Sequence, residues 1–239
     1  MNRREFSQRS CAQAAVWTLA PLWIGVATPV HALGWSDLSQ ADATRGLKTA
    51  LERGAVAAIG LLGKNDGFLG NAKVRIPLPS YLQDASKVLK ALGQGPRLDE
   101  LVTSMNRAAE AAVPLAKNLL TNAVRNMSVA DAKAILSGSD TSVTSFFAEK
   151  TREPLFAQFF PVVARSVDKV GLAVKYNRVA SQAANLGLIA QQDASIQQYV
   201  TGKALDGLYL VIGEQEQAIR KDPVGTGSAI LRKVFGALK

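Results

Sequence analysis

Apolar residues recur at steps of three and four along most of the chain, a spacing typical of amphipathic helices rather than strands. The first such run follows Ser39, whose spacing from Asp42 is that of a helix start, and it ends at Gly63. The pattern predicts helices over residues 39–62, 81–92, 98–127, 129–137, 143–147, 155–170, 172–186, 196–221 and 228–235.

Local signals mark several of the helix ends. Ser128 and Asp131 have the spacing of a capping box and predict a short helix from Val129 to Ser137. Ser139 and Asp140 are candidate caps for the helix that follows. Gly93 and Gly187 stand where a glycine commonly ends a helix. Pro114 should kink or divide the long run from Leu98 to Met127, because proline lacks the N–H that a helix interior requires.

One stretch, residues 66–79, does not follow helical spacing. It begins with Gly67 and Gly70, which can adopt positive φ at little cost, and residues 73–76 alternate between polar and apolar. Pro77 and Pro79 end it, since each removes a backbone donor and disfavours helical geometry in the preceding residue. We expect a short extended arm or β-hairpin near residues 68–78.

The segment 204–212 is apolar on nearly all sides, which predicts a helix at the centre of the fold. Lys203 and Asp206 lie one turn apart in this helix, and a buried charge requires a partner. They form either a structural ion pair or a ligand-anchoring site. The aromatic run at Phe156, Phe159 and Phe160 is interpreted as core, rather than as a slot for lipid or ligand.

The first 32 residues have the organisation of a cleavable signal peptide: a basic start, an apolar run from about residue 12 to 27, and small residues at Val30 and Ala32. Arg3-Arg4 followed by Phe6 resembles a twin-arginine export signal, and an ordinary secretory signal is the alternative. We therefore expect a periplasmic or secreted protein of residues 33–239, forming one helical domain. Pro21 interrupts the apolar run, so no transmembrane segment is expected after cleavage.

Cleavage would remove Cys11 and His31, the one cysteine and the one histidine of the sequence. The mature chain would then lack disulfides, a thiolate nucleophile, an imidazole base and cysteine or histidine metal ligands. We expect no metal and no cofactor. The full chain has a formal net charge of +9 and stays basic after cleavage, which favours partners with negative charge. The charge is not gathered in a stripe with aromatic residues, so nucleic acid is not an expected partner.

Several segments resemble the bacterial DUF4197 family, whose function is unknown. They are DGFLGN (66–71), VRIPLP (74–79), MNRAAEAAVP (105–114), DAKAIL (131–136), KALDGL (203–208), DPVG (222–225) and KVFG (233–236). The resemblance covers about residues 38–236 in order. It implies an exported or envelope-associated protein and does not imply any particular activity.

Six residues are candidates for a ligand-binding site. Asn106 and Glu110 share a helix face with Lys117, and with Arg107 they form either a polar pocket or an ordinary solvated face. Arg75 is fixed between two apolar residues, so its guanidinium can pair with a neighbouring carboxylate or with an anionic ligand. Lys203 and Asp206 complete the set. No catalytic residue is assigned.

Two functions fit these observations. The first is a non-catalytic binding module for an anionic or amphipathic ligand, an envelope component or a protein partner. The alternative is an enzyme that works through carboxylates and lysine, such as Glu110 with Lys203 or Asp206. The enzyme requires these side chains to converge in a cavity.

Overall fold

The computed structural model describes residues 40–222 except 140, 188 and 191–193. The chain divides into two units, 1–32 and 33–239, and the first lies wholly outside the described residues, as does the helix expected from Ser228. Within the described part of 33–239 the elements are helices and no strand is found, so the all-α prediction is confirmed.

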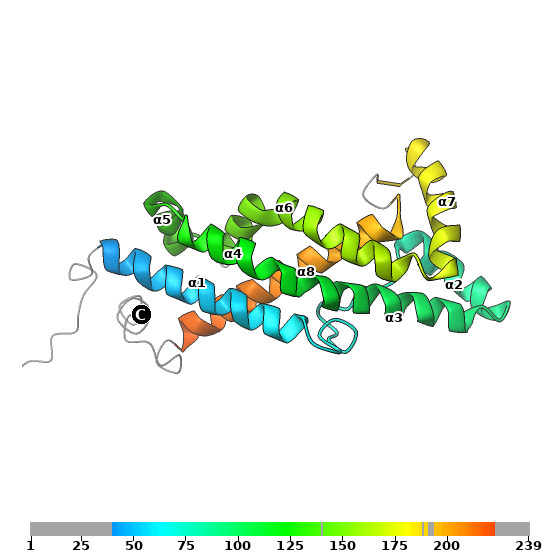
Figure 1. The fold of residues 1–239 in the computed structure, drawn as a ribbon, viewed down its shortest axis with the longest axis horizontal. Helices are drawn as coiled ribbons and strands as arrows, with labels where there is room; N and C mark the ends of the chain where they lie inside the picture. Colours follow the sequence, from blue (N-terminus) through cyan, green and yellow to red (C-terminus); the bar gives the residue numbers. More distant parts are fainter. Residues whose placement is uncertain (1–39, 140, 188, 191–193, 223–239) are drawn as a thin grey trace, which may run out of the picture. The chain divides into compact units, whose positions relative to one another are not determined.

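Helix α8 (Ile196–Lys221) is the centre of the packing. It contacts α1 (Gln40–Leu62), α3 (Gly95–Ala112) and α6 (Ser142–Val167), and α1 and α6 also pack on α4 (Ala116–Arg125) (Figure 1). Between Val200 and Ile212 most α8 side chains are buried, as the nearly continuous apolar sequence predicts. At Gly54 a Cβ would stand 3.8 Å from the backbone nitrogen of Glu216, so α1 and α8 approach closely there.

The predicted break at Pro114 is confirmed. A single turn of 3₁₀-helix, η2 (Val113–Leu115), separates α3 from α4. Proline is tolerated in the first turn of a helical segment, where its missing N–H has no intrahelical acceptor. The apolar face continues through the break, because Val113 and Ala116 are both fully buried.

The shorter helices begin and end close to the predicted residues. Helix α5 (Val129–Ser137) starts with the capping box of Ser128 and Asp131. Helices α2 (Ser80–Ala91) and α7 (Gly171–Asn185) are followed by Gly93 and Gly187, each with a φ of 72°. These are left-handed conformations that glycine adopts without strain.

Three predictions about α6 need correction. The helices expected over residues 143–147 and 155–170 are one continuous helix, which contains Pro154 and Pro161. Thr141 is the residue at its N-cap, without a side-chain cap hydrogen bond, so Ser139 does not cap it, and Asp140 lies outside the described residues. The core assignment of the aromatic run holds fully only for Phe159. Phe156 and Phe160 are half-buried and stack on each other, with ring centroids 6.0 Å apart.

The predicted hairpin near residues 68–78 is wrong. The connection from α1 to α2 is a series of turns, with backbone hydrogen bonds such as Gly70 N to Asp66 O, followed by an irregular stretch up to Pro79. Positive φ occurs at Asp66 (62°), and not at either glycine. Gly67 is needed for space instead, because a Cβ there would lie 2.3 Å from the carbonyl oxygen of Leu62.

This connection, residues 63–79, is called the α1–α2 loop below. Although it is irregular, its apolar side chains belong to the core: Phe68, Val74 and Ile76 are all buried. Phe68 and Val74 pack on Gly207 of α8, where an added Cβ would be 2.9 Å from the Phe68 ring and 3.2 Å from Val74 Cβ. The loop is therefore held against the central helix of the fold.

Candidate functional site

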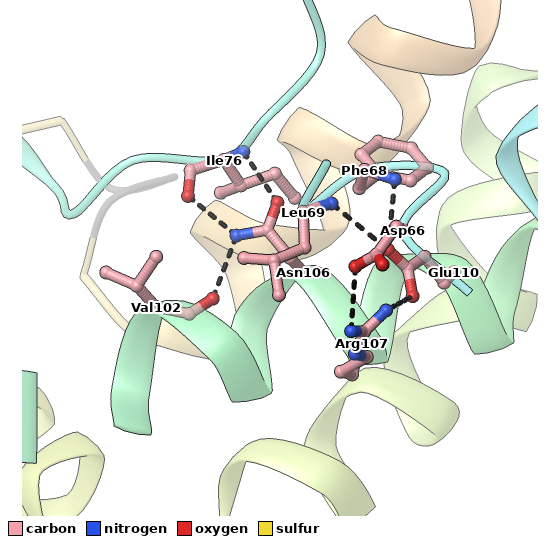
Figure 2. A network of polar contacts seen from close by, with 8 residues as sticks. All are labelled: Asp66, Phe68, Leu69, Ile76, Val102, Asn106, Arg107 and Glu110. Carbon is pink, nitrogen blue, oxygen red and sulfur yellow. Dashed lines mark hydrogen bonds and ion pairs between the residues drawn. The ribbon is translucent and has the colours of Figure 1, made fainter. Parts of the chain in front are cut away.

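Asn106 of α3 binds the backbone of the α1–α2 loop at Ile76. Its side-chain oxygen accepts a hydrogen bond from Ile76 N at 2.8 Å, and its amide nitrogen donates to Ile76 O at 2.9 Å and to Val102 O at 2.8 Å (Figure 2). Asn106 is fully buried. Its amide therefore supplies Ile76 with the pair of hydrogen bonds that a neighbouring strand would otherwise provide.

One helical turn further along α3, Glu110 binds the beginning of the same loop. Its Oε1 accepts hydrogen bonds from the backbone N–H groups of Phe68 and Leu69, both at 3.0 Å. Its Oε2 accepts from Arg107 at 2.7 Å, and Arg107 donates in turn to Asp66 at 2.8 Å (Figure 2). The hydrogen bond from Arg107 to Glu110, followed by the one to Asp66, raises the pKa of the Arg107 guanidinium above its usual range.

The set Asp66, Asn106, Arg107 and Glu110 is called the loop clamp below. The structure brings the three predicted residues of α3 together, and their polar atoms are engaged by the protein itself. Glu110 can be buried because both of its carboxylate oxygens accept hydrogen bonds, which offset the cost of removing the charge from water. Lys117, predicted on the same face, is exposed. The arrangement fits a structural role, since it fixes the loop to α3.

Lys203 and Asp206 are not buried, contrary to the sequence-based expectation. Their side chains are 47 % and 50 % exposed, and Lys203 Nζ lies 3.9 Å from Asp206 Oδ2. The closer partner of Asp206 is Arg152 of α6, at 2.8 Å. The helix is apolar nearly all round, but these two residues occupy its one open stripe, together with Leu210, which is 45 % exposed.

A surface groove of about 310 Å³ joins the α1–α2 loop to this stripe of α8. Three of the predicted residues line it: Arg75 from the loop, and Lys203 and Asp206 from α8. Tyr199 forms part of the wall; its hydroxyl donates to Pro77 O at 3.2 Å, and Lys203 Nζ lies 5.9 Å from its ring centre. This groove is called the loop groove below.

Arg75 is exposed in the loop groove. Its backbone N–H donates to Asn71 O, but within the part of the chain that the structure describes its guanidinium has no hydrogen bond or ion pair. Lys73, the other loop cation that lines this groove, pairs with Glu214 of α8 at 2.7 Å. Of the two partners considered for Arg75, a neighbouring carboxylate is therefore not found among the described residues.

A second hollow of about 510 Å³ lies on the other side of the same stripe, between α8 and α6. It shares Asp206 and Leu210 with the loop groove, and its α6 wall includes Thr144 and Arg152. At its base Tyr209 is buried and makes a 3.0 Å hydrogen bond with Thr151. Burial raises the pKa of Tyr209, so its phenol is neutral at physiological pH and is no base.

Sequence reasoning selected Arg75, Lys203 and Asp206 but missed Lys73, Tyr199 and Leu210, which line the same groove. Leu210 was read as core, because nothing in an apolar run shows which residue remains uncovered. The spacing of Tyr199, Lys203, Asp206 and Leu210, at steps of three and four, was the available signal that they share one face.

Among the described residues no group of three or more His, Cys, Asp or Glu is placed to hold a metal ion. None of the described helices combines the length and the apolar character that crossing a bilayer takes.

Taken together, the described residues form an all-helical protein in which a clamped loop and the central helix border an open basic groove. The chain belongs to the DUF4197 family, proteins of unknown function, whose model matches residues 37–236. No curated protein and no solved structure matches the chain.

Proposed function

We propose that this protein is a non-catalytic binding module that holds the anionic part of a ligand or partner in the loop groove. The single observation that carries the proposal is the Arg75 guanidinium, exposed in a groove beside Lys203 and without a partner among the described residues. Guanidinium binds carboxylate or phosphate through two parallel hydrogen bonds, which makes it a common anchor for such groups.

The balance of charge in the groove supports an anionic occupant. Asp206 is engaged by Arg152, and Glu214 is engaged by Lys73. Both carboxylates near the groove thus have a close cation of their own. Arg75 has no carboxylate partner among the described residues, and Lys203 has only the longer, 3.9 Å contact with Asp206, so both can act on an occupant. Apolar surface from Pro77 and Leu210 lies beside these cations, so an occupant with both anionic and apolar parts fits best.

The alternative, a carboxylate and lysine enzyme, receives no support from the positions of its residues. Both carboxylate oxygens of Glu110 accept hydrogen bonds within the loop clamp. Lys203 and Asp206 stand on the exposed face of α8. General acid and base catalysis needs groups that reach one reacting atom, and no described cavity is lined by all three.

The test uses dodecyl phosphate below its micelle concentration as the probe, with inorganic phosphate and a cationic dodecyl amphiphile for comparison. We expect dodecyl phosphate to bind most tightly, and Arg75→Gln to weaken it by about tenfold, the loss of one charge-assisted contact. Lys117→Gln is the matched control, because it removes one exposed positive charge outside the groove. Equal losses in the two variants would refute a localised site.

We propose further that the protein acts after export, in the periplasm or outside the cell. The basis is the signal-like segment of residues 1–32, which lies outside the described residues. Sequencing the N-terminus of the protein recovered from a periplasmic fraction should give Leu33 as the first residue. Recovery of the uncleaved chain from the cytosol would contradict this proposal.

A further inference from the structure

One stripe of the central helix is left open. Between Val200 and Ile212, the exposed α8 residues are Lys203, Asp206 and Leu210. The other residues of this span are buried, except for the half-buried Gly202. Leu210 is one of several large apolar side chains that are exposed among the described residues, and it differs from them in lining two hollows that also carry charged residues.

The loop groove and the second hollow meet on this stripe, since both are lined by Asp206 and Leu210. One is bordered by the α1–α2 loop and the other by α6. Their lining on α8 extends from Tyr199 to Gln217, which corresponds to about 27 Å at 1.5 Å per residue. The two hollows thus adjoin along α8 at Asp206 and Leu210, and together they are called the α8 groove below.

We propose that the occupant of the α8 groove is an amphipathic, acidic helix of another protein, an inference that rests on the function proposed above. It places an apolar side chain on Leu210 and a carboxylate at Arg75. The length of the α8 groove exceeds what a small anionic molecule would cover, and it matches about five turns of helix. Helices that lie in surface grooves use apolar anchors spaced along one face.

The positions of the charged residues determine how the occupant helix would be oriented in the α8 groove. The loop-groove half carries the cations Lys73, Arg75 and Lys203, whereas the half toward Gln217 carries one cation, Arg152, and one carboxylate, Glu214. Lys203 and Leu210 are about two helical turns apart on α8. An occupant helix aligned with α8 should therefore carry its acidic residue about two turns from its apolar anchor. Complementary charges of this kind fix register and partner choice.

The test is site-specific photo-crosslinking in cells that naturally make the protein. Leu210→p-benzoyl-phenylalanine places the photoreactive group on the open stripe. Val56→p-benzoyl-phenylalanine is the matched control, because Val56 is 46 % exposed against 45 % for Leu210 and lies on α1, outside the groove. We expect one discrete protein adduct from position 210 and none from position 56.

Three further readouts make the result specific. Arg75→Glu in the same chain should reduce the adduct about fivefold or more, because it replaces attraction by repulsion. Mass spectrometry of the adduct should show an acidic residue about two helical turns from the crosslinked apolar residue. Leu210→Arg, tested by competition with the unmodified chain, should likewise fail to bind the partner.

Three outcomes overturn the inference: equal adducts from positions 56 and 210, an adduct of two copies of this chain, or a lipid adduct alone. In each case dodecyl phosphate binding separates the two proposals. If binding still depends on Arg75, the helical partner is wrong and the anion site stands. If it does not, the proposed function fails as well.

Discussion

Asn106 and the backbone of Ile76 form a two-way hydrogen-bonded pair, 2.8 Å from Ile76 N to the amide oxygen and 2.9 Å from the amide nitrogen to Ile76 O. The two residues are 30 positions apart in the sequence and are both buried. A buried backbone group without a partner costs about 1–3 kcal/mol. The side chain of Asn106 therefore allows an irregular loop to cross the core surface.

Asn106→Asp should destabilise the fold by about 2–4 kcal/mol, because a carboxylate would face the two carbonyl oxygens to which the amide now donates. The free energy of unfolding in urea is the measurement. Asn118→Asp on the exposed face of α4 is the control and should change it by less than about 0.5 kcal/mol. Similar losses for both variants would mean that the amide is not needed.

Glu110 offers a second test of the loop clamp. Glu110→Ala removes the acceptor of two backbone N–H groups, and of these Phe68 N is buried, so we expect a loss of about 2–4 kcal/mol. Glu110→Gln keeps one acceptor oxygen and should lose less. As a reference, Glu149→Ala breaks a surface ion pair whose glutamate is 73 % exposed, and should cost about 0–1 kcal/mol. If Glu110→Ala lowers the free energy of unfolding no more than Glu149→Ala does, Glu110 does not hold the loop in place.

Sequence patterns predicted those parts of the fold whose causes are local. The start of α5 at Ser128 and Asp131 and the break at Pro114 each depend on residues within one helical turn. The α1–α2 loop was misread because its cause is distant. Alternation at residues 73–76 indicated a strand, but the hydrogen bonds of Ile76 go to a side chain of α3 instead of another strand.

The candidate site was predictable in its residue types but not in its grouping. Arg75, Lys203 and Asp206 were selected one by one, and the structure brings them to the same groove. Asn106, Arg107 and Glu110 were selected as a cluster and do form one, whose polar atoms bind the protein itself. Adjacency on a helix face shows which residues meet but does not show what stands opposite them.

Ser128→Ala tests the cap of α5. Hydrogen bonds from the Ser128 side chain and backbone lower the pKa of Asp131. The variant should raise this pKa toward its ordinary value, as followed by a carboxyl NMR titration, and should cost about 1 kcal/mol at neutral pH.

A lowered pKa in the folded state gives stability that is present above the unfolded-state pKa and is lost as the pH falls through the folded-state value. The gap in unfolding free energy between wild type and Ser128→Ala should therefore shrink in acid. Ser137→Ala, which removes a hydroxyl bonded to Lys133 O in the same helix, should leave the pKa of Asp131 unchanged. An unchanged titration in Ser128→Ala would disprove the assignment.

Gly207 and Gly202 form a matched pair on α8, and together they test whether the loop is seated on this helix. At Gly202 an added Cβ meets nothing within 4 Å, so Gly202→Ala should stabilise the protein by up to about 1 kcal/mol through helix propensity. At Gly207 the same methyl would lie 2.9 Å from the ring of Phe68, which is fully buried and cannot move away freely. Gly207→Ala should therefore destabilise by about 1–3 kcal/mol despite the gain in propensity.

The second substitution Phe68→Leu identifies the cause, because it removes the ring atoms that meet the new methyl. If overlap with Phe68 is responsible, the double variant should be more stable than the sum of the two single losses predicts, by about 1 kcal/mol or more in urea unfolding. If the losses of unfolding free energy in the two single variants simply add in the double variant, the overlap lies instead with Val74, whose Cβ is 3.2 Å from the added Cβ. Equal stabilisation by Gly207→Ala and Gly202→Ala would show that the loop does not rest on α8 at all.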